Sequence, residues 1–205
     1  MTTKNKKGFT IIEVVLVLAI AGLIFLMVFI ALPALQRSQR NTQREDDLAR
    51  IITGVNNYQT NNNGKVPFRE GATGTELATF VQRYIDKNCK TVKTVTTTNG
   101  SGDSATTQSW TTFESCGDSN EFRDPQGNIY KIASGGKAVT TTGSGDSTST
   151  TAGKDVANLV AEESFLGFYN ATCGDEGHAN GGTGDRDVAV FMKLEGGAIA
   201  CNDNH

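Results

Sequence analysis

The chain has 205 residues, enough for one domain with a hydrophobic core and an additional segment. Its formal net charge is −3 with 19 Lys and Arg residues, which argues against the clustered basic surface that phosphate binding requires. The composition is mildly hydrophilic as a whole, but the apolar residues are concentrated near the N-terminus.

This apolar segment is long enough to cross a membrane. No charged residue occurs from Val14 to Leu35, and at 1.5 Å per residue a helix of this length spans about 30 Å, the thickness of a bilayer core. Lys4, Lys6 and Lys7 precede it, so the positive-inside rule keeps the N-terminus in the cytoplasm. We therefore expect one membrane helix followed by one domain outside the cytoplasm.

Glu13 is the only charge between Lys7 and Arg37, and a carboxylate in lipid costs about 2.5–3.5 kcal/mol on insertion scales. A cleaved secretory signal, with "ALPA" at 31–34 as its cleavage site, has a shorter apolar region. A simple membrane anchor leaves the acid unexplained, and a soluble helix of this length is not apolar on all faces in so small a domain.

The string "KKGFTIIEVVLVLAI" accounts for the acid, because it resembles the signature of type IV prepilins. The resemblance covers about the first fifth of the chain. It implies that a prepilin peptidase cuts between Gly8 and Phe9, that Phe9 becomes N-methylated, and that Glu13 serves filament assembly. A carboxylate and the amine of a neighbouring Phe9 would then satisfy each other's charge inside the filament.

The helix is expected to continue beyond the membrane. Pro33 should kink or locally melt it, because proline lacks an N–H and clashes with the preceding turn. The apolar face of Leu48, Ile51, Ile52, Val55 and Tyr58 predicts an amphipathic second half that docks on the remaining domain. "NNNG" at 61–64 should end this helix, with Gly64 at its C-terminal cap.

Three patterns predict further elements. A capping box of Thr73 and Glu76 begins a short helix. The turn 124–127 leads into a strand, in a string, "FRDPQGNIYKIA", that is similar to the D-P-x-G-N-x-Y element of pseudopilins and related pilins. Residues 187–194 and 198–202 form a terminal hairpin around the turn 195–197.

Two stretches of low complexity, 95–107 and 139–151, alternate strand-forming and turn-forming residues, so each is a candidate hairpin tip on the surface. The segment 154–172 is ambiguous between helix and strand.

The four cysteines are widely spaced and even in number, which outside the cytoplasm indicates two disulfides. Sequence permits three connectivities. We predict the local pairings, Cys89 with Cys116 and Cys173 with Cys201.

No catalytic or metal-binding constellation is evident. His178 and His205 lie in Gly-, Asn- and Asp-rich loops, where solvated histidines are expected. The acidic string 173–187 lacks the spacing of an EF-hand, so we expect a solvated loop and no cofactor, with bound calcium as the alternative. Loss of Lys4, Lys6 and Lys7 with the leader takes the net charge from −3 to −6, so no direct nucleic-acid binding is expected.

The predicted fold is α+β, a long N-terminal helix packed on a small antiparallel sheet. We expect a leader (1–8), a membrane and filament-core helix (9–35), its amphipathic continuation (36–61) and a globular head (62–205). The resemblance implies a non-enzymatic subunit of a type IV pilus, a homo-oligomeric filament that serves adhesion, motility or DNA uptake.

Its partners would be the prepilin peptidase, the assembly machinery in the cytoplasmic membrane and, before assembly, the membrane lipid. A pseudopilin of a type II secretion system and a single-pass surface adhesin are the alternatives. The subunit is expected in the cytoplasmic membrane first and on the cell surface after assembly.

Overall fold

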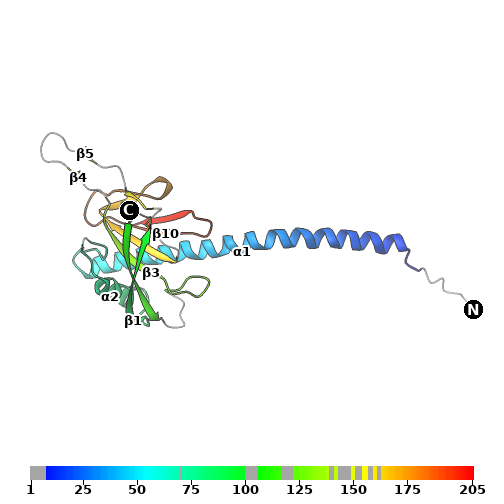
Figure 1. Cartoon of the computed structure of the whole chain (residues 1–205), viewed down its shortest axis with the longest axis horizontal. Coiled ribbons are helices and arrows are strands. Elements are labelled where there is room, and N and C mark those ends of the chain that lie inside the picture. The colour runs from blue at the N-terminus through cyan, green and yellow to red at the C-terminus, as the bar shows by residue number, and fades with distance from the viewer. Residues whose placement is uncertain are drawn as a thin grey trace, which may run out of the picture. The chain divides into compact units, whose positions relative to one another are not determined.

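The computed structural model describes residues 8–69, 71–99, 106–116, 122–138, 141–142, 149–150, 154–156, 159–160 and 163–205 (Figure 1). The leader residues before Gly8, the tip of the 95–107 stretch and most of the 139–151 stretch lie outside them. The chain divides into two compact units, residues 1–40 and Asn41–His205, and each is described by itself.

The first unit contains the apolar part of helix α1, which as a whole spans Ile11–Asn61. The helix continues without interruption through Pro33, so the local melting that we gave as one possibility does not occur. Proline removes a single backbone hydrogen bond, and the alanines and leucines around it are strong helix formers. A kink at Pro33 stays a prediction.

The large apolar side chains of this first unit are all exposed to solvent in the single chain. Even Leu32, the least exposed of its large hydrophobic side chains, is 43% exposed, and Phe9 is 90% exposed. A helix that is apolar on all sides belongs in lipid or among other apolar helices. This part of α1 is long and apolar enough to cross a membrane.

In the second unit, α1 ends where the sequence predicted. The N–H of Gly64 donates to the carbonyl of Gln59 at 2.8 Å, and both Asn63 and Gly64 have positive φ, 54° and 78°. Helix α2, Gly74–Tyr84, begins at the predicted capping box of Thr73 and Glu76. Each boundary therefore arises from local chemistry that a few consecutive residues supply.

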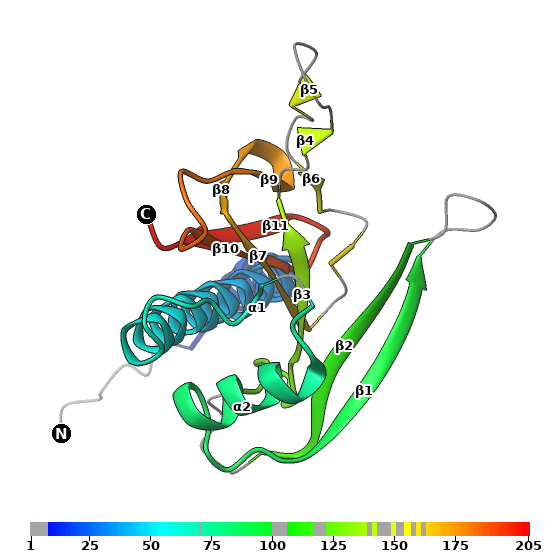
Figure 2. The ribbon, with the colours of Figure 1, turned by 90° about the vertical axis from the view of Figure 1, so that its left-hand side faces the viewer.

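The main sheet has six strands in the order β1-β2-β3-β7-β10-β11 (Figure 2). All neighbours are antiparallel except β3 and β7, which are parallel. The strands are β1 Lys90–Asn99, β2 Thr106–Ser115, β3 Lys131–Lys137, β7 Ser164–Tyr169, β10 Val188–Lys193 and β11 Ile199–Asp203. The described part of the ambiguous segment 154–172 is thus mainly strand.

Short strands complete the second unit. Strand β4, Thr141–Thr142, pairs with β5, Ser149–Thr150, and a three-stranded sheet has the order β6-β9-β8. Its strands are β6 Lys154–Asp155, β9 His178–Gly181 and β8 Ala171–Cys173, with a 3-10 turn, η2 Asp175–Gly177, between β8 and β9.

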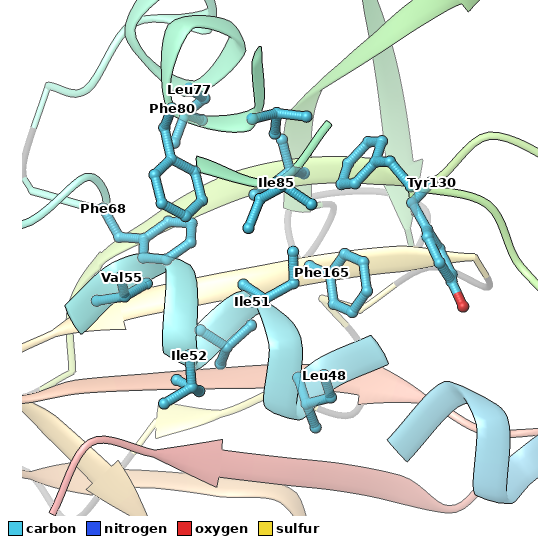
Figure 3. Packing of buried hydrophobic residues seen from close by; sticks show 14 of the residues in the cluster. Leu48, Ile51, Ile52, Val55, Phe68, Leu77, Phe80, Ile85, Tyr130 and Phe165 are labelled. Carbon is cyan, nitrogen blue, oxygen red and sulfur yellow. The ribbon is translucent and has the colours of Figure 1, made fainter. Parts of the chain in front are cut away.

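The six-stranded sheet has a buried core on each face, because successive side chains of a strand point to opposite sides. On one face, Val188, Val190 and Met192 of β10 belong to a core that includes the predicted apolar face of α1 and the buried apolar side chains of α2 (Figure 3). On the other face, Ala189 and Phe191 belong to a second core with residues of β8 and β9 and with Val156, which follows β6. The sheet is therefore covered on both sides.

Gly167 of β7 allows the ring of Phe68 to pack closely against the backbone of this strand. A Cβ atom on Gly167 would lie 2.3 Å from a ring carbon of Phe68, which is fully buried. No larger residue fits there without displacing that ring.

Two disulfides join the cysteines in the same local pairings that we expected, Cys89–Cys116 and Cys173–Cys201. The first links the segment after α2 to the end of β2, and the second links β8 to β11. The α+β class is confirmed, with a long helix packed on a mostly antiparallel sheet. The terminal hairpin is confirmed as β10 and β11.

Candidate assembly site

The N-terminal end of α1 carries the residues that the sequence assigned to assembly. Glu13 lies in the first turn, and one of its oxygens accepts hydrogen bonds from the backbone N–H of Thr10 at 2.9 Å and from its hydroxyl at 2.8 Å. The Glu13 N–H points back to the Thr10 hydroxyl oxygen at 3.4 Å. These contacts have the form of a capping box, in which two free N–H groups of a helix end are satisfied reciprocally.

Thr10 is the residue that our sequence analysis missed. The T-x-x-E spacing of Thr10 and Glu13 is the same signal that we used for Thr73 and Glu76. In the single chain, Glu13 therefore has a local partner, and its side chain still lies on the exposed surface beside Phe9. The pairing of Glu13 with the amine of a neighbouring Phe9 stays a prediction.

A second set of polar residues fixes α1 within the Asn41–His205 unit. Arg44 is only 4% exposed, and its guanidinium lies 3.5 Å from a carboxylate oxygen of Asp124 and 3.4 Å from one of Glu195. The charge of Arg44 is therefore buried between two carboxylates.

The D-P-x-G-N-x-Y element supplies one of these carboxylates. Asp124 accepts hydrogen bonds from the N–H groups of Gln126 at 3.1 Å and Asn128 at 2.6 Å, which shape the predicted turn. Tyr130, fully buried, donates its hydroxyl to Asp47 of α1 at 2.8 Å. The element therefore forms a turn, enters the sheet and contacts α1 at two points.

Burial raises the pKa of Asp47, although the hydrogen bond from Tyr130 and the nearby charge of Arg50 lower it. Burial likewise raises the pKa of Tyr130 well above its ordinary value, so this hydroxyl remains protonated and donates. A hollow of about 520 Å³ opens beside this pair, between α1 and the turn 124–127.

The terminal hairpin makes the third contact with α1. The side-chain amide of Asn41 donates to the backbone carbonyl of Glu195 at 3.2 Å and accepts from its N–H at 3.0 Å. Both backbone hydrogen-bonding groups of Glu195, the first residue of the hairpin turn, are thus satisfied by one helix residue.

The acidic loop near the C-terminus is organised around Asp187. Its carboxylate accepts hydrogen bonds from Thr183 and Gly184, and His205 lies 3.2 Å from it. Burial alone would raise the pKa of Asp187, but the hydrogen bonds from Thr183 and Gly184 lower it. Asp175 and Asp185 are exposed. Calcium binding here stays an untested alternative.

One other group brings potential metal ligands together within the described residues, namely Asp86, Cys89 and Cys116. The two sulfur atoms are bonded to each other in a disulfide, so neither is a thiolate ligand. The group is therefore part of the covalent framework of the second unit.

Comparison with known proteins supports the assignment of the N-terminus. Residues 3–29 match the family described as the prokaryotic N-terminal methylation motif, which is the prepilin motif of type IV pilins and pseudopilins. No curated protein and no solved structure matches the chain significantly. The chain is thus pilin-like or pseudopilin-like at its N-terminus, and the motif indicates a structural subunit rather than an enzyme.

Proposed function

We propose that this chain is a subunit of a type IV pilus that polymerises through the apolar part of α1 into a cell-surface filament. The observation that carries the proposal is the prepilin motif at residues 3–29. In the single chain, the apolar residues behind that motif lie exposed on all sides of α1. Lipid covers such a helix before assembly, and neighbouring copies of it cover it in a filament.

Processing precedes assembly in this proposal. A prepilin peptidase cleaves between Gly8 and Phe9, and Phe9 receives a methyl group. The subunit waits in the cytoplasmic membrane until the assembly machinery moves it into the filament. The Asn41–His205 unit then lies on the outside, where its two disulfides survive in an oxidising environment.

The runner-up is a pseudopilin of a type II secretion system, which the D-P-x-G-N-x-Y element favours. That element contacts α1 through Asp124 and Tyr130. Two disulfides and a large head favour a pilus subunit. A surface adhesin that never polymerises is the third possibility. The capping box with Thr10 would then explain Glu13 without any neighbouring subunit.

Imaging separates the three. Material sheared from cells and the cell envelopes that remain are each labelled with an antibody to this protein and examined by electron microscopy. Long labelled filaments support the pilus, short labelled stubs that stay with the envelope support the pseudopilin, and labelled membrane without filaments supports the adhesin. The result expected here is long filaments.

A further inference from the structure

A groove lies where the last turns of α1 meet α2, away from the N-terminal assembly residues in the sequence. It consists of two adjoining hollows of about 170 and about 600 Å³, which share Asn62, Arg83 and Tyr84 in their linings. The lining of the first hollow is completed by Tyr58, Thr75, Glu76 and Thr79, and that of the second by Asn57 and Asn61. We call it the Tyr58–Tyr84 groove.

The two tyrosine rings in the groove pack against each other and against the buried ring of Phe80. They meet edge to face with their centroids 5.4 Å apart, and the Tyr84 ring stacks on the buried ring of Phe80 at 6.0 Å. Both tyrosines remain half-buried. A rigid aromatic surface with a polar tip is therefore presented to the groove with little conformational entropy left to lose.

The second hollow is lined by three neutral amides, those of Asn57, Asn61 and Asn62. The Asn62 amide donates to the Tyr58 carbonyl at 2.8 Å and to the Tyr84 hydroxyl at 3.2 Å, which fixes its orientation. Asn57 and Asn61 are exposed one helical turn apart, and their side chains have no hydrogen-bond partner in the part of the chain that the structure describes. Each amide offers an acceptor oxygen and two donor hydrogens.

Arg83 adds a cation to this lining. Among the described residues it takes part in no ion pair, whereas Glu76, which also lines the first hollow, is held by Arg69 and Thr73. One guanidinium is too little for a nucleic-acid backbone, which requires clustered basic residues. It suffices for one carboxylate on a small ligand.

We propose that the Tyr58–Tyr84 groove binds a saccharide. A pyranose ring has an apolar C–H face, which fits an aromatic surface, and a row of hydroxyl groups that both donate and accept, which fits a row of amides. A uronic acid adds a carboxylate for Arg83. An amphipathic peptide helix would need an apolar groove instead. The proposal does not depend on which kind of filament the subunit forms.

The test uses the full chain in phosphocholine micelles, since detergents with sugar headgroups would compete. Saturation-transfer NMR with irradiation of aromatic protons follows two probes, cellotriose and trigalacturonic acid. We expect transfer to the ring C–H protons of at least one probe. Replacing both amides, Asn57→Ala with Asn61→Ala, should raise its Kd about tenfold or more, since the hydrogen bonds of both amides to the sugar hydroxyls are lost.

The matched control is Asn56→Ala, an exposed asparagine of the same helix that does not line the groove. It should leave the Kd unchanged. Absence of transfer to both probes would overturn the proposal. So would a Kd that is equal in the double variant, the control and the wild type.

Discussion

At the scale of single residues, Arg44 shows how α1 is held in the Asn41–His205 unit. Its guanidinium lies between Asp124, whose side chain is fully buried, and Glu195. A buried ion pair adds little net stability compared with apolar residues of the same shape, but removal of one partner leaves a buried charge without compensation. Arg44 therefore specifies where the turn 124–127 and the terminal hairpin meet the helix.

Arg44→Ala should destabilise the Asn41–His205 unit by about 3–5 kcal/mol, because two carboxylates then lose their cation. Urea denaturation of the full chain in detergent measures this, with Trp110, the single and fully buried tryptophan, as the fluorescent probe. The matched control is Arg50→Ala, whose side chain is 44% exposed, and it should cost about 0–1 kcal/mol. Equal effects of the two variants would contradict this assignment.

Asp47 gives the unit a predictable pH dependence. Its pKa is raised above the ordinary value of 3.8, so the folded chain favours the protonated acid. The resulting stabilisation is complete below the unfolded pKa and is lost as pH rises through the folded pKa. Asp47→Asn keeps an acceptor for the Tyr130 hydroxyl but does not titrate.

The free energy of unfolding of Asp47→Asn, relative to wild type, should therefore increase as pH rises from about 3 toward neutrality. Urea denaturation of both proteins at a series of pH values measures this difference, in which the other carboxylates cancel. A difference that is constant, or that falls with pH, would show that Asp47 does not titrate as its burial requires.

At the scale of elements, local signals were predictable and long-range contacts were not. The cap at Gly64, the capping box at Thr73 and the terminal hairpin all depend on a few neighbouring residues, and the structure confirms each. The parallel pairing of β3 with β7 joins strands separated by a long crossover, and no pattern within either strand specifies its neighbour.

The same reason explains what was missed in the candidate sites. Tyr130 and Asp47 are 83 positions apart, so their hydrogen bond has no sequence signature. The burial of Arg44 is equally long-range in origin. Thr10 is different, since its contact with Glu13 arises from a T-x-x-E signal within four consecutive residues and was predictable from the sequence.

The capping box of α2 provides a test at this scale. Thr73→Ala removes the hydroxyl that accepts from the Glu76 N–H, and it should destabilise the unit by about 1 kcal/mol. Thr79→Ala, an exposed position inside the same helix, should be neutral or slightly stabilising, since alanine is the better helix former. If both variants lose stability equally in urea denaturation, the cap does not set the start of α2.

At the scale of the whole molecule, polymerisation through Phe9 and Glu13 requires that the leader be removed. Intact-mass analysis of filament subunits should show loss of Met1 to Gly8 and the gain of one methyl group. The physical reason is that the new amine of Phe9 provides the positive charge that Glu13 is proposed to meet in a neighbouring subunit. A mass that corresponds to cleavage near Ala34 would mean that the N-terminus is an ordinary secretory signal.

Variants of Glu13 test polymerisation most directly, because its carboxylate has two possible roles, in the capping box with Thr10 and in an ion pair with a neighbouring subunit. As part of a capping box it needs only an acceptor, which glutamine also supplies. As the partner of a buried amine it needs its charge, and loss of that partner costs about 3–5 kcal/mol per contact. Thr10→Ala separates the two further, since it removes the hydroxyl of the cap and leaves the carboxylate in place.

The decisive measurement is filament yield beside the amount of subunit in the membrane, for wild type, Glu13→Ala, Glu13→Gln and Thr10→Ala. Assembly through the charge predicts normal membrane levels in all four, filaments that are absent or sharply reduced in both Glu13 variants, and filaments that are largely retained in Thr10→Ala. Normal filaments from Glu13→Ala, or from Glu13→Gln, would contradict the claim that this charge drives polymerisation.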